Sequence, residues 1–587
     1  MTRALLFSLL LAATSAAQAP ASGVPADTAA LAPPARAAAL PDSAAQADPF
    51  ARAARGPDGP YAPLAPALAG VVWAAPDSAE AAVADLVAMR QAGVRAVRTG
   101  LVPEAVLAAA DRLGIAVAQE LPFANLPAGP LARVLPEAER VLAEALDRAR
   151  AHPSARLFIL ARGADTSDPA AVPFFERLTA LARERGASGT RTAYLTRFVD
   201  DDVASGAVDL VLLDARDADP FAVLARWRAR HEAPAGLGAW GAGVIPGREG
   251  GWRRAGTEAH QARTAEATLD ALATARDAPE AAFYHAWRDA DERDTRAAVA
   301  GLRYGLRAED GSARPAFDVV SGWFTGRQRV FAFDAGPAQR SRGSGLVVLI
   351  GWGLVLGLGT LLATSPRLGG LVPQYFGRRD LYREAVQKGY GLSGGVTAGL
   401  AGLLALVVGL VGATVLRAVG ATGALAVATS TWEAGAQARL AGLLESPALL
   451  GALLAGVYAA WLLFNVVWVG ILAGRRRRLR TVQALSLVVW TRWWWVFLLL
   501  GAMLIASLPP EAAGPWAATL FVLALVVEAV AAYRTGVDLM YVSGAGAGRA
   551  LGLGFAVPLV LALVGLGVLL ANAGDEIGFL WHLAVRS

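Results

Sequence analysis

The 587-residue sequence contains no cysteine, a single lysine and only five histidines. Without cysteine the chain can form no disulfide, no thiolate metal site and no cysteine nucleophile. The histidines are scattered and form no HxH or HxxxH pair, so the sequence indicates no metal site and no other cofactor. Because Lys388 is the only lysine, arginine carries nearly all of the positive charge.

Charge of either sign is also scarce. Charged residues make up 18% of the chain and hydrophobic residues 55%, whereas about a quarter of an average soluble protein is charged. The net charge is +5, but the basic residues lie beside apolar runs and form no single soluble patch. Membrane topology explains that distribution better than nucleic acid does. The expected partner is therefore a lipid bilayer, and no nucleic acid.

The N-terminus has the pattern of an export signal. A short positive region is followed by about ten apolar residues and an A-x-A-like end, which predicts a signal peptide over residues 1–19. The alternative, a first membrane anchor, needs a longer apolar run. Residues 20–61 are rich in Ala, Pro, Asp and Ser without periodicity, and this composition predicts a disordered linker.

Between residues 62 and 335, short apolar runs alternate with stretches that have the helical period. The expected strands are 68–73, 96–98, 116–119, 157–160, 192–195, 208–213, 235–239 and 281–287. The expected helices are 79–91, 103–113, 135–151, 171–185, 220–230, 257–276 and 294–306. Eight strands, nearly all followed by a helix, predict an α/β fold of the (β/α)8 TIM barrel type.

Residues 336–587 predict an all-α transmembrane bundle of about six helices. The apolar runs 345–364, 391–416, 447–472, 483–507, 515–533 and 550–571 each have the roughly 20 residues needed to cross a bilayer. Arginine is concentrated between the first and second runs, between the third and fourth, and at both ends of the loop between the fifth and sixth. By the positive-inside rule these loops are cytoplasmic. The barrel and the C-terminus are then outside the cytoplasm of a bacterial cell, in agreement with the signal peptide.

Five stretches in the expected barrel resemble glycoside hydrolase family 2, the β-galactosidase, β-glucuronidase and β-mannosidase group. Residues 85–99 (DLVAMRQAGVRAVRT) are similar to its DLxLMKxxGFNAVRTSHYP motif, and 111–120 (DRLGIAVAQE) to CDELGILVIDE. HPS at 152–154 is similar to the start of HPSVILWSLGNE, and 233–242 (APAGLGAWGA) to KPVLITEFGA. The last stretch, 304–317, is similar to the closing GLVDxxGRPKPAY. The matches follow the family's order, which implies its catalytic TIM barrel.

The resemblance also implies that the family's two catalytic glutamates are missing. A retaining glycosidase needs two carboxyl groups about 5–5.5 Å apart, one as acid/base and one as nucleophile. The positions of the family's NE dipeptide hold Arg162 and Gly163, and the position of the TEFG glutamate holds Ala239. The histidine of SHYP is replaced by Leu101. We therefore expect a catalytically degenerate barrel.

Other residues near the expected strand ends keep two alternatives open. Hydrolysis by relocated carboxylates would have to use residues from the set Glu120, Asp165, Asp214 and Asp217. These carboxylates equally suit loop solvation or hydrogen bonding at the end of the barrel. The residues that map to the C-terminal face of the strands, where such barrels bind ligands, are Arg98, Glu120, Arg162, Trp240 and Trp287. They are candidate carbohydrate-binding residues, with packing at the barrel end as the alternative for both tryptophans.

Two charged residues lie inside expected membrane spans, Arg492 in the fourth and Glu528 in the fifth. Charges within a bilayer are costly and are usually paired. We expect an Arg492–Glu528 ion pair, with an arginine that extends to the membrane interface as the alternative.

Three functions are compatible with these features. The first is a membrane-tethered, degenerate glycosidase-like barrel that binds carbohydrate or an envelope protein partner at the cell surface. The second is an active membrane-anchored retaining glycoside hydrolase with relocated carboxylates. The third is a transport or envelope-assembly membrane protein with an accessory barrel.

Overall fold

A computed structural model describes the chain over twelve ranges of residues. The ranges are 68–289, 302–336, 342–390, 392–421, 424–428, 439–440, 442–444, 446–473, 479–508, 510–544, 546–551 and 575–585. The expected signal peptide (1–19) and linker (20–61) lie outside them.

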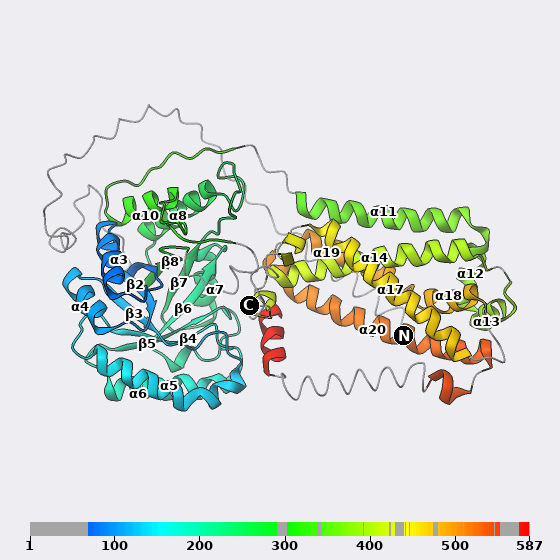
Figure 1. Cartoon of the computed structure of the whole chain (residues 1–587), viewed down its shortest axis with the longest axis horizontal. Helices are drawn as coiled ribbons and strands as arrows, with labels where there is room; N and C mark the ends of the chain where they lie inside the picture. The colour runs from blue at the N-terminus through cyan, green and yellow to red at the C-terminus, as the bar shows by residue number, and fades with distance from the viewer. Residues whose placement is uncertain are drawn as a thin grey trace. The chain divides into compact units, whose positions relative to one another are not determined.

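The N-terminal part of the described chain is a closed barrel of eight parallel strands in sequence order, with β1 paired to β8. The strands are β1 (Leu68–Val72), β2 (Ala96–Gly100), β3 (Ala116–Glu120), β4 (Leu157–Arg162), β5 (Arg191–Thr196), β6 (Leu210–Arg216), β7 (Ala235–Gly241) and β8 (Ala281–Tyr284). The helices are α3 (Ala79–Gln91), α4 (Glu104–Leu113), α5 (Ala128–Ala149), α6 (Val172–Arg185), α7 (Pro220–Arg230), α8 (Glu258–Thr274) and α10 (Pro315–Phe324). Figure 1 shows these helices arranged around the strands. The predicted TIM barrel is confirmed.

Two expected elements of the barrel were wrong in part. The helix expected over 294–306 does not include residues 302–306, because Arg303 instead exchanges two backbone hydrogen bonds of 2.7 Å with Val244. Residues 294–301 lie outside the described ranges. Helix α5 begins at Ala128, well before the expected start at 135, and continues through Pro136. The sequence suggested a start near this proline, because proline is tolerated best in the first helical turn.

Alternation along the strands separates two apolar layers. On β6, Val211 and Leu213 pack outward against the helices, whereas Leu210 and Leu212 fill the interior of the barrel. Ala96 and Ala118 belong to the same interior layer on β2 and β3. On each of these strands the next interior position, two residues further on, is charged: Arg98 on β2, Glu120 on β3 and Asp214 on β6. Strand geometry therefore carries charged side chains toward the barrel axis.

The C-terminal part contains apolar helices long enough to cross a membrane. Four qualify singly: Gly345–Thr364 within α11 (Arg342–Thr364), Gly394–Gly420 within α14 (Gly394–Ala421), α17 (Pro447–Ala473), and Ala512–Ser543 within α20 (Pro510–Ser543). A fifth span is made by α18 (Thr481–Trp490) and α19 (Trp495–Ser507) if this pair, bent by 46°, counts as one. Two shorter helices, α12 (Pro366–Gly377) and α13 (Arg379–Lys388), lie at one end of the bundle in Figure 1. These findings indicate a membrane protein.

Five of the six expected spans thus correspond to described helices, and the sixth, at 550–571, lies almost wholly outside the described residues. The fourth expected span, 483–507, is not one straight helix. At the break Thr491 Oγ1 donates to the carbonyl of Val488 at 3.0 Å, and Arg492 Nη1 donates to the same oxygen at 2.7 Å. Side chains that bind the carbonyls of a last helical turn replace backbone donors there, which allows the chain to turn.

Candidate functional site

The first charged cluster at the strand ends joins β2, β3 and β4. Arg98 Nε lies 3.4 Å from one oxygen of Glu120, and Arg162 Nε lies 3.3 Å from the other. Arg98 is only 2% exposed, and this burial lowers the pKa of its guanidinium to about 10. Its Nη1 also donates to the carbonyl of Gly238 at 2.6 Å. Glu120 is therefore held between two arginines, and both of its oxygens have a cationic partner.

Glycine at position 238 is required by this packing. A Cβ added there would lie 2.4 Å from Leu195 Cδ1 and 3.5 Å from Arg98 Nη1. The same Cβ would lie 2.7 Å from Leu212 Cβ, an atom that cannot move by a rotation of its own side chain, so any side chain would displace the layer on which Arg98 rests.

A second charged cluster forms around Asp214 on β6. One Asp214 oxygen accepts from Arg216 Nη2 at 2.6 Å and from Arg197 Nε at 3.0 Å. The other accepts from Arg216 Nε at 2.9 Å. Burial opposes the charge on Arg216, but the Asp214 carboxylate raises its pKa above the ordinary value. Arg216 Nη1 lies 3.4 Å from His285 Nε2.

The surroundings of His285 disfavour its protonated form. Burial lowers its pKa well below the ordinary value, and the positive charges of Arg216 and Arg98 lower it further. Both carboxylates of the strand ends are thus matched by arginines: Glu120 by Arg98 and Arg162, and Asp214 by Arg197 and Arg216. The four arginines thus outnumber the two carboxylates that they contact.

The other two candidate carboxylates also have partners. Asp165 accepts from Ser167 Oγ at 2.6 Å and is 2% exposed. Asp217 accepts from the backbone N–H of Gly243 at 2.8 Å and from the Tyr304 hydroxyl. Over the described residues, no group of three or more histidines and carboxylates is arranged to hold a metal ion.

Gly163 and Ala239, the two positions where the sequence resemblance leads one to expect glutamates, lie in surroundings that disfavour a glutamate. Gly163 has a φ of 63°, and a Cβ there would lie 2.8 Å from Asn125 Oδ1. A positive φ is costly for a residue with a side chain. Ala239 is 1% exposed and pairs with Asp214 in the β6–β7 register, so a glutamate there would bring a second negative charge beside Asp214.

The two candidate tryptophans lie in the packed layer between the barrel and its helices. Trp240 is 0% exposed and meets Tyr284 edge to face at 5.0 Å between ring centroids. Trp287 is 1% exposed, and its ring lies 5.7 Å from that of Phe317. Neither ring presents a free face to a sugar. The structure therefore brings Arg98, Glu120 and Arg162 together and places Trp240 and Trp287 elsewhere.

Three residues of the second cluster were missed in the sequence. Arg216 continues the interior alternation of β6 two residues after Asp214, so the period-two pattern was a usable signal. Arg197 follows the last residue of β5, and His285 the last residue of β8. Arg197 and His285 are each the first residue after a strand, and no pattern in the sequence distinguishes them from other loop residues.

The structure also brings Arg492 and Glu528 together. Arg492 Nη2 lies 2.6 Å from Glu528 Oε1, and the arginine is 1% exposed. Glu528 also accepts from the Tyr458 hydroxyl at 3.0 Å and from the indole N–H groups of Trp461 and Trp495, each at 3.2 Å. The carboxylate thus connects α20 with α17 and with the break between α18 and α19.

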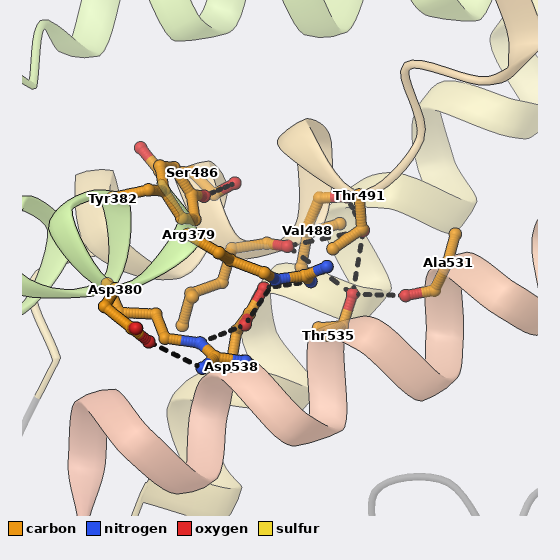
Figure 2. Close-up of polar contacts among 11 residues, drawn as sticks. Arg379, Asp380, Tyr382, Ser486, Val488, Thr491, Ala531, Thr535 and Asp538 are labelled. Carbon is orange, nitrogen blue, oxygen red and sulfur yellow. Dashed lines mark hydrogen bonds and ion pairs between the residues drawn. The ribbon is translucent and has the colours of Figure 1, made fainter. Parts of the chain in front are cut away.

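A polar stripe continues from Glu528 along α20. Thr535 follows at i+7 and Asp538 at i+10, spacings that lie on one helical face. Figure 2 shows Thr535 next to Thr491, with 2.9 Å between the hydroxyl oxygens, and Arg379 of α13 on Asp538 at 2.8 Å. Arg383 Nε reaches the same carboxylate at 2.8 Å. The stripe therefore attaches α13 and the broken span to one helix.

Fold and site together define a protein class: a (β/α)8 barrel with an arginine-rich strand end, in the same chain as helices able to cross a membrane. No family model matches the sequence, and no curated protein matches it either.

Solved structures of glycoside hydrolases resemble the barrel. A GH2 β-galacturonidase from Eisenbergiella tayi bound to galacturonate has 16% identity and a TM-score of 0.39, over 45% of this chain and 52% of that chain. A β-glucuronidase of an uncultured Clostridium has 19% identity and a TM-score of 0.39, over 44% and 50%. A β-glucuronidase from Ruminococcus gnavus in complex with D-glucaro-δ-lactam has 16% identity and a TM-score of 0.38, over 44% and 49%. The chain spans about half the length of these structures, and the likeness concerns the barrel fold alone.

Proposed function

We propose that this chain is a membrane-anchored, glycosidase-like protein whose barrel has lost hydrolysis and binds a carbohydrate or a protein partner at the cell surface. One observation carries the proposal. The strand-end carboxylates Glu120 and Asp214 are each held by two arginines, while the positions expected for the family's glutamates are Gly163 and Ala239.

Loss of hydrolysis follows from how a retaining mechanism works. It needs one carboxyl group that gives a proton to the leaving oxygen and a second that attacks the anomeric carbon. Every oxygen of Glu120 and Asp214 lies against an arginine nitrogen, so none is presented to a glycosidic bond. General acid–base catalysis alone contributes about 10²–10⁴-fold, and the contribution of the nucleophile is lost as well.

The test of lost hydrolysis is an assay of the full chain, held in nanodiscs, on aryl β-glycosides. We expect no turnover above that of empty nanodiscs, either for the parent chain or for the double variant Glu120→Gln/Asp165→Asn. Turnover that this double variant abolishes would contradict the proposal and favour an active hydrolase with relocated carboxylates. An unchanged melting temperature shows that the variant remains folded.

Binding is tested separately on a glycan array that contains matched acidic and neutral glycans. The excess of arginine at the strand ends favours the acidic members. Arg162 is the most exposed member of the cluster, at 32% of its side chain. We therefore expect Arg162→Glu to weaken binding of acidic glycans, while Arg228→Glu on the outer helix α7 leaves it unchanged. A silent array would favour an accessory role of the barrel for the membrane part.

The orientation, with the barrel outside the cytoplasm, rests on the signal-peptide pattern and on the arginine-rich loops. Because the chain has no native cysteine, single cysteines report the side directly. An impermeant maleimide should label Ala151→Cys on the barrel in intact spheroplasts. It should label Gln387→Cys on α13 only after permeabilisation, and the reverse result would overturn the orientation.

A further inference from the structure

Arg534 of α20 forms no ion pair with any of the described residues, although it lies in an apolar helix that can cross a membrane. Its guanidinium lies 5.9 Å from the ring centroid of Trp494, which belongs to the break between α18 and α19. It also lies beside the hydroxyl group of Tyr375 on α12. Glu528, on the same helix, is already paired with Arg492. Charges within a bilayer are costly and are usually paired, so the position of Arg534 calls for an anionic partner.

Among the described residues, the other carboxylates at this end of the bundle already have cationic partners. Asp538, one turn beyond Arg534 on α20, accepts from Arg379 at 2.8 Å (Figure 2) and from Arg383 at 2.8 Å. The two carboxylates of α13 are exposed and pair with basic residues of their own helix. Arg379 and Arg383 therefore balance Asp538, and the charge of Arg534 is left without a carboxylate in the described part of the chain.

The exposed aromatic residues of α20 place Arg534 at the level of lipid head groups. Trp516 is 51% exposed and Tyr533 is 49% exposed, and the large exposed side chains between them are all apolar. Seventeen residues of helix separate the two, a distance of about 26 Å, which is close to the roughly 30 Å of a hydrocarbon core. Tryptophan and tyrosine collect at the two edges of that core. Arg534 directly follows Tyr533 and therefore lies at one edge.

The surroundings of Arg534 offer hydrogen-bond donors without acceptors. The Tyr375 side chain is buried, and because arginine can only donate to its oxygen, the hydroxyl proton has no acceptor among the described residues. The indole N–H groups of Trp490, Trp493 and Trp494 have no acceptor there either. The Trp490 ring lies 5.7 Å from that of Tyr375 and 5.8 Å from that of Trp493. Buried donors are normally bonded, so this site suits a ligand whose polar atoms are acceptors.

We propose that Arg534, Tyr375 and Trp494 bind the phosphate group of an anionic phospholipid at the edge of the membrane. The phosphate oxygens accept from the guanidinium and from the hydroxyl, as guanidinium groups bind phosphate strongly. An acyl chain of the same lipid lies along α20, where exposed apolar residues occur four, eight and eleven positions before Arg534 and hence on its helical face. A lipid with net negative charge is favoured over a zwitterionic one, because no carboxylate of the described chain balances Arg534.

The test measures lipid binding to the full chain by native mass spectrometry in a non-ionic detergent. Dioleoyl phosphatidylglycerol and dioleoyl phosphatidylcholine share the phosphate and the acyl chains and differ in net charge. We expect the parent chain to bind phosphatidylglycerol about fivefold more tightly or better, the size expected for one arginine near an anionic lipid. Glycerol 1-phosphate, which has the phosphate without acyl chains, should not displace the lipid at equal concentration. Displacement would identify a site for free phosphate esters and overturn the assignment to a lipid.

Variants of the site give the second arm. Arg534→Gln should weaken phosphatidylglycerol by about tenfold, the size expected for loss of a hydrogen bond between charged groups, and should remove the preference over phosphatidylcholine. Arg549→Gln is the matched control, because it removes the same charge at an exposed position beyond α20, and it should keep the preference. Melting temperatures identify a variant that fails to fold. In that case Tyr375→Phe, which keeps the ring and removes one donor, should still weaken phosphatidylglycerol.

Two results would overturn the proposal. One is equal affinity of the parent chain for the two lipids. The other is an equal loss of phosphatidylglycerol binding in Arg534→Gln and Arg549→Gln, which would indicate a general effect of charge on the lipid. Neither result depends on whether the barrel binds a glycan or hydrolyses one.

Discussion

Removal of the Asp214 carboxylate should destabilise the barrel strongly. The carboxylate side chain is 1% exposed and neutralises Arg216, which is 3% exposed, and Arg197, which is 11% exposed. Asp214→Ala leaves buried guanidinium charge without its counterion. Breaking a buried pair in this way costs about 3–5 kcal/mol. Because about 1.36 kcal/mol corresponds to a factor of ten, barrel opening should become roughly two to four orders of magnitude more frequent.

The assay uses Val211→Cys, a 0% exposed position on β6, as the sole cysteine of the chain. A maleimide reaches this thiol only when the barrel opens, so the labelling rate under native conditions reports the opening free energy. Asp270→Ala, an exposed carboxylate on α8, is the control and should change the rate little. Asp214→Leu/Arg197→Met/Arg216→Met should recover much of the loss, because apolar residues often replace a buried charge group without cost when every member is replaced. An Asp214→Ala effect smaller than tenfold would refute this account of the strand end.

Three further predictions concern Gly163, the Arg492–Glu528 pair and Asp111. Gly163→Glu should give no aryl glycosidase activity, and a gain of turnover would contradict this. The variant should also lower the free energy of unfolding by about 1–3 kcal/mol in thermal unfolding, because a side chain is strained at the positive φ of this position. In the membrane part, Arg492→Glu and Glu528→Arg should each reduce the yield of folded protein on detergent size-exclusion chromatography, and the double exchange should restore part of it; no recovery would count against a pairwise interaction. Burial raises the pKa of the Asp111 carboxyl group, but hydrogen bonds from Ser154 and His152 hold this pKa below the ordinary value. The ionised carboxylate therefore stabilises the folded barrel above about pH 4, and this stabilisation is lost as the pH falls through the pKa of the folded state. Hydrogen exchange of β4 should therefore depend less on pH below 4 in Asp111→Asn than in the parent chain, and equal pH dependence would refute the assignment.

The sequence predicted the barrel well where the strands are regular. Helices α3 and α7 begin and end at the expected residues, and each of the eight strands is found near its expected position. The site was harder to predict because the sheet register shifts near the strand ends, between Ile159 and Arg162 on β4 and between Leu237 and Trp240 on β7. Irregular pairing re-aims side chains and interrupts the period-two rule. Trp240 therefore packs among the helices, although its position in the sequence suggested a cleft.

In the membrane part, too, some features were predicted from the sequence and others were not. Mean hydropathy and length located the apolar spans, because a bilayer-crossing helix needs about 20 apolar residues. Hydropathy carries no information about a break within an apolar run, so the bend between α18 and α19 was not predicted. Thr491 and Arg492 are the local signal, since both bind the carbonyl of Val488. A charged residue next to a hydroxyl residue in an apolar run is the feature that could have indicated the break.

The ion pair between Arg492 and Glu528 has a consequence for how the bundle is made. Arg492 lies in the break between α18 and α19, and Glu528 lies in α20, which begins three residues after the end of α19. Either charge alone at the centre of a bilayer costs about 2.5–3.5 kcal/mol during insertion. We therefore expect a newly made α18–α19 segment to enter lipid most readily together with α20, as a hairpin in which the charges are already paired. Insertion of this segment would then depend on a residue that is synthesised after it.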